Sequence, residues 1–213
     1  MTGCQVRLQP ASSDDHAGLS DQLPLLLDDA TRVAIEKLRA DQVSFNLQTV
    51  ITRQNSIQPE RMYRYLRTLG TPHLQFIPLQ ERDNPQSVTD QQWGTFLSTV
   101  FDVWVREDIG RVCVQLFDST LGVWRGSPSQ YGSFDVTGDP GKHTFLSGKC
   151  QTCVFLRACN GDCTYSRVED ISALCAGYQA FFRHSAPHMR VMRDLIRHHR
   201  SPMELMAVLR QSH

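Results

Sequence analysis

The stretch VSFNLQTVI, Val43 to Ile51, decides the fold expected for this chain. Its side chains alternate between an apolar face and a face that carries Ser44, Asn46 and Gln48. Alternation with a period of two residues predicts a β-strand with one buried face. Two further apolar stretches are predicted as strands: HLQFIPL, His73 to Leu79, and RVCVQLF, Arg111 to Phe117.

Helical patterns alternate with the three predicted strands. A first helix is expected over residues 28–41, where an aspartate caps apolar residues at helical spacing. A second helix lies between Pro59, which suits a first helical position, and Gly70, which suits the residue after the last turn. The spacing of Thr89 and Gln92 fits a capping box at the start of a long third helix. Strands that alternate with such helices predict an α/β fold with a parallel sheet and right-handed crossovers.

Each predicted strand also carries a glutamine: Gln48, Gln75 and Gln115. Asn46 and His73 lie on the matching faces of their strands, so all five side chains line one surface if the strands keep register. These side chains either face solvent or bond to nearby backbone, or they form a polar inner wall of a barrel segment that faces a cofactor or substrate. Three strands cannot close a barrel, so we expect open sheet edges and self-association through them.

Composition divides the chain into three parts. Residues 1–27 show almost no periodicity and are expected to be a poorly ordered lead-in. Glycines and prolines crowd the stretch from Gly122 to Gly148. This crowding places a boundary near Gly126, between residues 28–126 and 127–213.

The C-terminal part is expected to be mainly helical. Its apolar residues from Leu174 to Ile196 follow a helical stripe, which Pro187 interrupts. Since proline removes a backbone hydrogen bond in a helix interior, a kink or break is expected there. A last short helix is expected over residues 202–210.

Length, composition and charge exclude several classes of protein. With 213 residues and 40% hydrophobic residues, the chain can bury a sizeable core and is not expected to be disordered. The 22 basic residues balance 22 acidic residues, so no overall charge attracts nucleic acid or an acidic membrane surface. No apolar run approaches the ~20 residues of a membrane span, and the N-terminal sequence lacks the pattern of a signal peptide. We therefore expect a cytoplasmic protein with no nucleic-acid or membrane partner.

Five of the seven cysteines lie close together, at Cys150, Cys153, Cys159, Cys163 and Cys175. A CxxC turn points both of its sulfurs inward, and thiolates are ligands for zinc and for iron–sulfur clusters. In a reducing compartment, clustered thiols hold a metal or do redox chemistry more often than they form disulfides. The spacing therefore predicts a metal site and leaves zinc and iron–sulfur open. Cys113, in a predicted strand, is expected to be a small core residue.

Three stretches together carry a resemblance to a known family: LQFIPL from Leu74, CQTCVFLRACNGDC from Cys150 and LCAGYQAFF from Leu174. With the sequence around them, they resemble the anaerobic sulfatase-maturing enzymes, which are radical S-adenosylmethionine proteins that oxidise a Cys or Ser of a sulfatase to formylglycine. The resemblance implies an α/β fold, with a three-strand segment of a partial β/α barrel over residues 28–126. It also implies a small, mainly helical, cysteine-rich iron–sulfur domain of the SPASM type over residues 127–213.

The resemblance also implies roles for individual residues. The ligands of one complete 4Fe–4S cluster are matched by Cys150, Cys153, Cys159 and Cys175, and Cys163 matches a ligand of a second cluster. Gln48, or its neighbour Leu47, falls where the barrel of the family touches S-adenosylmethionine. A sulfatase polypeptide is the partner that the resemblance implies.

The chain also departs from the family pattern. The family binds its catalytic cluster with a CxxxCxxC loop, whereas this chain has only Cys4 before Cys113. A second cysteine group and the aspartate base beside it are also missing, since Asp135 and Asp139 follow no cysteine. The chain therefore resembles a truncated and internally deleted form of the family. It is not expected to be catalytically competent alone, no catalytic residue is assigned, and S-adenosylmethionine remains a cofactor of the family rather than of this chain.

Two functions from different classes remain open. The first is an iron–sulfur protein of this family that keeps one cluster. The second is a zinc-stabilised or metal-free interaction module that partners a full-length maturase or a sulfatase. Analysis of bound metal and acid-labile sulfide separates them.

Overall fold

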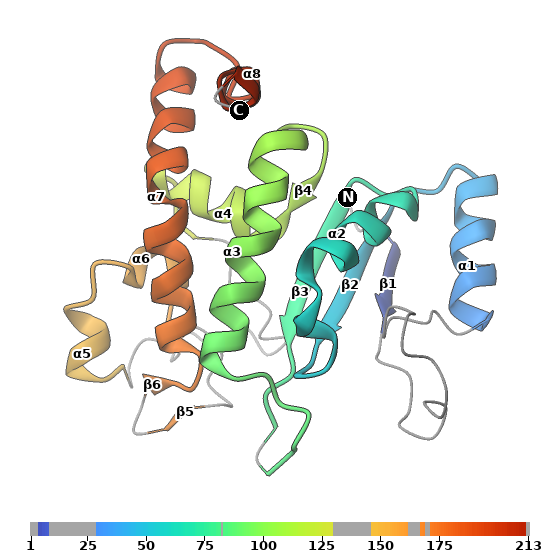
Figure 1. Cartoon of the computed structure of the whole chain (residues 1–213), viewed down its shortest axis with the longest axis horizontal. Helices are drawn as coiled ribbons and strands as arrows, with labels where there is room; N and C mark the ends of the chain where they lie inside the picture. The colour runs from blue at the N-terminus through green and yellow to red at the C-terminus, as the bar shows by residue number, and fades with distance from the viewer. Residues whose placement is uncertain are drawn as a thin grey trace.

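The fold is built around a parallel sheet of four strands. The computed structural model describes residues 4–8, 29–81, 83–129, 146–161, 167–168 and 171–211. Within these residues, the strand order is β1 (Cys4–Leu8), β2 (Phe45–Ile51), β3 (His73–Pro78) and β4 (Cys113–Val114). Every neighbouring pair of strands is parallel (Figure 1). The predicted α/β fold with a parallel sheet is confirmed.

The expected lead-in over residues 1–27 contains a strand. Strand β1 pairs with β2 in parallel register, from Cys4 opposite Phe45 to Leu8 opposite Thr49. The sequence signal is weak because CQVRL is only 5 residues long, so pairing with β2 decides its conformation. The expectation of a poorly ordered lead-in is wrong for these residues, and the remainder of 1–27 lies outside the described residues.

The third predicted strand is shorter than expected, and a helix takes its place. β4 has 2 residues, and α4 (Gln115–Trp124) begins where the sequence predicts more strand. Phe117 contacts Phe101 edge-to-face and stacks on Phe181, both at 5.3 Å between ring centroids. A short apolar run suits either a strand or a buried helix, and here the aromatic packing decides for a helix. Gln115 therefore starts a helix and does not extend the row of strand glutamines.

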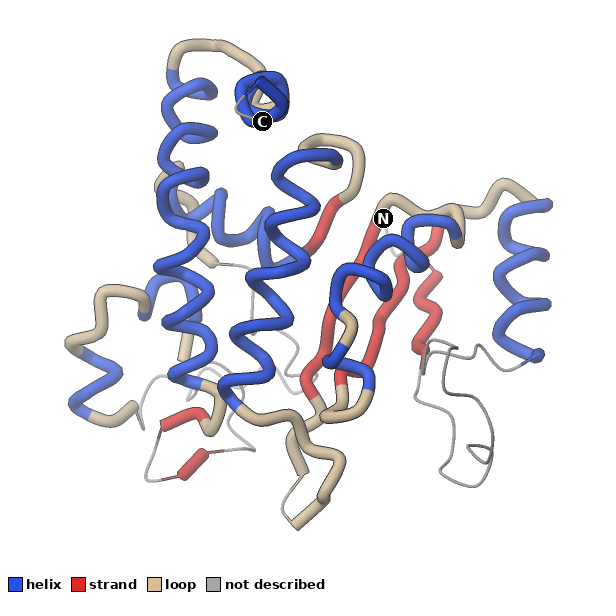
Figure 2. The backbone as a smooth tube through the Cα atoms, in the orientation of Figure 1, coloured by secondary structure: helices blue, strands red, loops and turns tan. Residues whose placement is uncertain are grey.

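The three helices predicted before this point are confirmed: α1 (Asp29–Ala40), α2 (Pro59–Thr68) and α3 (Asp90–Glu107). A short 3-10 turn, η2 (Asn55–Ile57), leads into α2. The predicted capping box is present, because the Thr89 and Gln92 side chains each accept a hydrogen bond from the other residue's backbone. Phe76 of β3 contacts Phe96 of α3 edge-to-face at 5.1 Å, and Figure 2 shows α2 lying over β2 and β3, with α3 beside it.

The face of the sheet opposite to Phe76 carries polar side chains in register. Gln48 and Gln75 are paired positions of β2 and β3, and Gln48 Nε2 donates a hydrogen bond to Gln75 Oε1 at 3.0 Å. Gln48 is 5% exposed, so its amide bonds inside the protein. The polar surface predicted from register exists for these two residues. Its role toward a cofactor or substrate stays a prediction.

The C-terminal part is mainly helical, as predicted. α7 (Cys175–Arg197) lies along α3 and runs through Pro187 without a break (Figure 1). Buried residues on both sides of the proline, including Phe181 and Met189, belong to the same core as α3. This packing offsets the one hydrogen bond that the proline removes, so the helix does not break at Pro187, and the alternative of a kink stays a prediction. The smaller elements are α5 (Gly148–Gln151), α6 (Leu156–Cys159), β5 (Arg167–Val168), β6 (Ile171–Ser172) and α8 (Glu204–Gln211).

The chain leaves the α/β part after α4. That helix ends at Trp124, and Gly126 follows with a φ of 96°, a backbone conformation that favours glycine. The domain boundary near Gly126 stays a prediction. No helix among the described residues is both long enough and apolar enough to cross a membrane.

Candidate metal centre

A short helix and a turn bring Cys150 and Cys153 next to each other. Ser147 caps α5, and its side-chain oxygen accepts a hydrogen bond from the Cys150 backbone N–H at 3.2 Å. The Cys153 backbone N–H then donates to the Cys150 carbonyl at 3.0 Å. This turn is the local structure that the two-residue spacing predicts.

Cys159 enters the same region from α6. Its backbone N–H donates to the Phe155 carbonyl at 2.9 Å. Asn160 and Gly161 follow with φ values of 52° and 75°, so the chain turns sharply after the cysteine. Phe155 stacks on Phe182 of α7 at 5.7 Å between ring centroids. This contact anchors residues 147–161, called the cysteine loop below, to α7.

Cys175 is the first residue of α7. Leu174, just before it, is 1% exposed and belongs to the hydrophobic core. Tyr178, one turn further on, contacts Trp93 of α3 edge-to-face at 6.0 Å. The core of the α/β part therefore determines where Cys175 lies.

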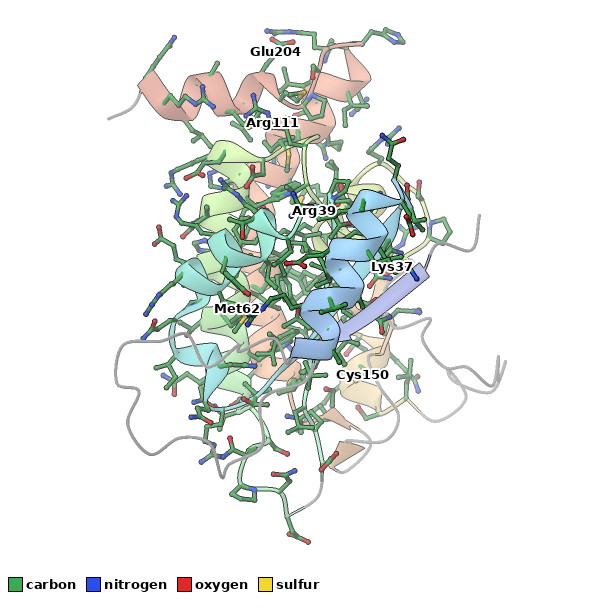
Figure 3. All side chains as sticks on the ribbon, turned by 90° about the vertical axis from the view of Figure 1, so that its right-hand side faces the viewer. Lys37, Arg39, Met62, Arg111, Cys150 and Glu204 are labelled. Carbon is green, nitrogen blue, oxygen red and sulfur yellow. The ribbon has the colours of Figure 1, made fainter. Side chains whose placement is uncertain are left out.

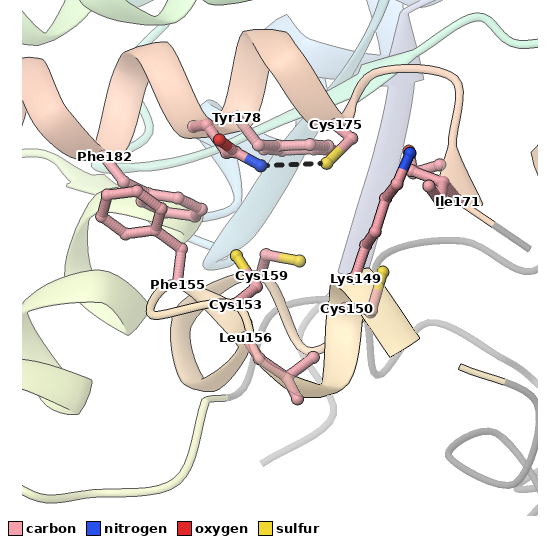
Figure 4. A pocket seen from close by; sticks show the side chains of 13 residues that line it. Lys149, Cys150, Cys153, Phe155, Leu156, Cys159, Ile171, Cys175, Tyr178 and Phe182 are labelled. Carbon is pink, nitrogen blue, oxygen red and sulfur yellow. Dashed lines mark hydrogen bonds between the residues drawn. The ribbon is translucent and has the colours of Figure 1, made fainter. Parts of the chain in front are cut away.

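One cavity joins these elements, and four cysteines line it: Cys150, Cys153, Cys159 and Cys175, called the pocket cysteines below. Figure 4 shows their sulfur atoms around a common space, with Cys175 on the α7 side and the other three on the loop side. The cavity measures about 110 Å³, several times the space that one water needs. None of the four is in a disulfide bond. The structure thus brings together the four cysteines that the resemblance assigns to one cluster.

The wall around the four thiols is largely apolar and carries one charged side chain among the described residues. The apolar part includes Phe155, Tyr178 and Phe182, and the charged residue is Lys149. Four thiolates would bring negative charge, which the lysine opposes. Among the described residues, no three His, Cys, Asp or Glu side chains are already gathered at the spacing of a bound metal ion. The donor chemistry fits a sulfur-ligated metal group.

Other residues singled out from the sequence lie elsewhere. Figure 3 shows Cys150 far from Glu204 of α8, so the cavity is at the end of α7 away from α8. Gln48 and Cys113 belong to the sheet and do not line the cavity. Cys163, Asp135 and Asp139 lie outside the described residues.

Cys113 is half-buried in β4 rather than fully enclosed in the core. Burial, together with the charge of the neighbouring Asp118 carboxylate and a hydrogen bond to it, raises the pKa of the Cys113 thiol to about 12. This thiol therefore stays protonated at neutral pH, in keeping with a structural role.

Sequence reasoning missed two side chains beside the pocket cysteines. Gln179 Nε2 donates a hydrogen bond to Cys175 Sγ at 3.4 Å, and Arg183 donates to Gln179 Oε1 at 2.9 Å. The Arg183 guanidinium also lies 5.4 Å from the centre of the Phe155 ring. Residues spaced by four share one helix face, so the spacing of Cys175, Gln179 and Arg183 is the signal that could have identified them.

Comparison with known proteins finds relatives along most of the chain. No family model matches. The uncharacterized protein YidF of Escherichia coli (strain K12) is 42% identical over 167 residues, which cover 76% of this chain and 90% of YidF. The serine-type anaerobic sulfatase-maturating enzyme of Bacteroides thetaiotaomicron is 27% identical over 248 residues, which cover 83% of this chain. The chain spans 60% of the length of that enzyme.

A solved structure shares the fold. Native anSMEcpe with bound AdoMet superposes with a TM-score of 0.70 at 18% identity. The match covers 90% of this chain and 69% of that chain. The α/β sheet and the helical part after it therefore belong to one architecture that both proteins share.

Proposed function

Because this chain belongs to one family with YidF and the anaerobic sulfatase-maturating enzymes, we propose that its four pocket cysteines bind one 4Fe–4S cluster. The observation that carries the proposal is that α5, α6 and α7, with the turns between them, bring four cysteines without disulfides to one cavity. Four cysteine thiolates are the usual ligand set of such a cluster. Membership in a family of radical S-adenosylmethionine enzymes supports an iron–sulfur cluster over zinc as the bound group, because such enzymes carry iron–sulfur clusters.

The residues around the cavity have distinct roles in this proposal. A bound cluster of this type supplies a site that accepts and releases one electron. The rings of Phe155, Tyr178 and Phe182 keep water away from the site, and Lys149 offsets part of the thiolate charge. Since Cys175 belongs to α7 and the other ligands belong to the loop, binding the cluster ties the loop to the core.

We extend the proposal to what this chain does by itself. Radical chemistry in the family uses a CxxxCxxC loop, and no cysteines in this sequence have that spacing. A cluster with a thiolate on each of its four irons offers no open position to a further ligand. The chain alone is therefore proposed to store or transfer one electron and not to form formylglycine. Cys163 stays a predicted ligand of a second cluster whose other ligands this chain lacks.

Partner and location complete the proposal. A sulfatase polypeptide is the proposed partner, since the relatives are named for sulfatase maturation. We place the protein in the cytoplasm, because a reducing compartment keeps cysteine thiols available as ligands.

Anaerobic reconstitution with iron and sulfide tests the cluster. We expect a brown protein with about four irons and four sulfides per chain, which bleaches when dithionite reduces it. Cys153→Ala should lose most of the iron. Cys113→Ala is the matched control and should keep it, because Cys113 lies outside the cavity.

Two results contradict the proposal. A stable colourless protein with one tightly held zinc and no sulfide would establish the zinc-stabilised module instead. If Cys163→Ala loses as much iron as Cys153→Ala, the assignment of the four ligands is wrong.

A further inference from the structure

We propose that Gln179 and Arg183 form a relay that raises the reduction potential of the cluster held by the pocket cysteines. Gln179 supplies an N–H to the Cys175 sulfur, and Arg183 holds the Gln179 amide in the orientation that makes this possible. The inference rests on the proposed cluster and adds the residues that tune it. Both act as positioning residues, because they reach the cluster through a ligand.

Arg183 determines which end of the Gln179 amide faces the sulfur. An arginine guanidinium has only donors, so the atom of Gln179 that it contacts at 2.9 Å must be the carbonyl oxygen. The NH₂ group of the same amide is then left on the Cys175 side, 3.4 Å from Sγ. Without Arg183, the amide is free to rotate and to present its oxygen to the sulfur, where two electron-rich atoms repel.

Phe155 fixes Arg183 in turn. The guanidinium lies 5.4 Å from the centre of the Phe155 ring, within the range of a cation–π contact. Phe155 belongs to the loop between Cys153 and Cys159, and it stacks on Phe182 of α7. The relay therefore spans both sides of the cavity and is held by the loop that carries the other ligands.

The hydrogen bond favours the reduced cluster for an electrostatic reason. Reduction by one electron from an external low-potential donor adds one negative charge, part of which resides on the ligand sulfurs. An N–H group that points at a sulfur stabilises the added charge, and hydrogen bonds to the sulfurs are known to set cluster potentials. The contact is partly buried, so water screens it less than it would at the surface.

A dye-mediated redox titration of the reconstituted full chain, followed by the spectrum of the reduced cluster, tests the relay. Gln179→Leu removes the donor, and we expect the midpoint potential to fall by about 59 mV, which corresponds to a tenfold change for a one-electron couple. Gln179→Glu should lower it further, because a carboxylate cannot donate to the sulfur and adds negative charge. Iron and sulfide content should stay at the wild-type level in both variants.

Arg183→Gln tests the orientation, and it needs a control for its lost charge. Arg190→Gln removes the same charge from an exposed position of the same helix. We expect Arg183→Gln to lower the potential more than Arg190→Gln does. In a Gln179→Leu background this excess should disappear, because Arg183 acts through the amide.

The possible failures are distinguishable. If the wild-type chain forms no cluster, the proposed function and the relay are both wrong. If all variants bind a full cluster at the wild-type potential, the relay is wrong and the proposed function stands. If Gln179→Leu loses its iron, its potential cannot be compared with the wild type, and the comparison of Arg183→Gln with Arg190→Gln tests the relay instead. Equal midpoint potentials in those two variants would overturn the relay.

Discussion

Gly94 of α3 and Gly177 of α7 bring the two helices into backbone contact. A Cβ atom on Gly94 would lie 2.9 Å from the Gly177 Cα, and one on Gly177 would lie 2.1 Å from the Asp90 carbonyl oxygen. A side chain at either position therefore forces the helices apart. Because Gly177 is two residues after Cys175, the same contact positions one of the proposed cluster ligands.

Gly177→Ala is expected to destabilise the protein. The added methyl group meets backbone, which cannot swing aside, so we expect a loss of roughly 1–3 kcal/mol in the free energy of unfolding. Chemical denaturation measures this loss, and the bound iron should fall as Cys175 is displaced. Gly122→Ala in α4 is the control, since its Cβ would meet its nearest neighbour at an ordinary 3.8 Å and alanine favours helix. Equal stability of the two variants would contradict this account of the helix contact.

Glu107 should make stability depend on pH in the acid range. Arg64 and Arg67 of α2 each contact its carboxylate at 2.7 Å. The hydrogen bond from Arg64, followed by that from Arg67, lowers the pKa of Glu107 from 4.5 to about 2, against the effect of burial. Because the folded-state pKa is below the unfolded one, this stabilisation is present above pH 4.5 and is lost as the pH falls toward 2.

Glu107→Gln measures that stabilisation. At neutral pH we expect the free energy of unfolding of the variant to be about 1 kcal/mol lower than that of the wild type. The loss is small because the Glu107 side chain is 35% exposed and solvent screens the ion pairs. In urea titrations at successively lower pH, the free energies of unfolding of variant and wild type should become equal near pH 2. Glu36→Gln, at an exposed position of α1, should have no comparable effect. If the difference in free energy of unfolding between Glu107→Gln and wild type stays constant with pH, the ion pairs are not its source.

The sheet edges are expected to make the chain self-associate. Within the described residues, β1 and β4 are the outer strands, and β4 pairs only with His73 and Leu74 of β3. Strand edges can pair with a second chain. Size-exclusion chromatography with light scattering should therefore give a mass that rises with protein concentration. A single monomeric species at every concentration would show that the edges are covered.

The reconstituted chain is expected to make no formylglycine. Cleavage of S-adenosylmethionine requires an iron with an open position, and the proposed ligand set leaves none. The assay combines the protein with dithionite, S-adenosylmethionine and a peptide that carries the sulfatase Cys or Ser. Formation of both 5′-deoxyadenosine and the aldehyde, and their loss in Cys153→Ala, would mean that the pocket cysteines hold an open-site cluster.

Local patterns predicted much of the fold. The alternation in Val43 to Ile51 indicates a strand, and the Thr89 and Gln92 pair marks the start of α3. Both signals depend only on residues that are close together in the sequence. The CxxC spacing of Cys150 and Cys153 likewise predicts their turn. The same reasoning failed for the run from Gln115 to Phe117, since a short apolar run has no period long enough to separate strand from helix.

The sequence by itself determined the periodic elements, the alternation of strands and helices, and a set of cysteines with metal-ligand spacing. Only the tertiary structure decided that Cys4–Leu8 joins the sheet, because that strand is defined by its pairing with β2. Tertiary packing also decided that Cys175 lies at the same cavity as the other pocket cysteines, since buried Leu174 and Tyr178 hold the start of α7 in the core. Sequence patterns report on residues that are neighbours along the chain, whereas contacts between distant segments depend on how the hydrophobic core packs.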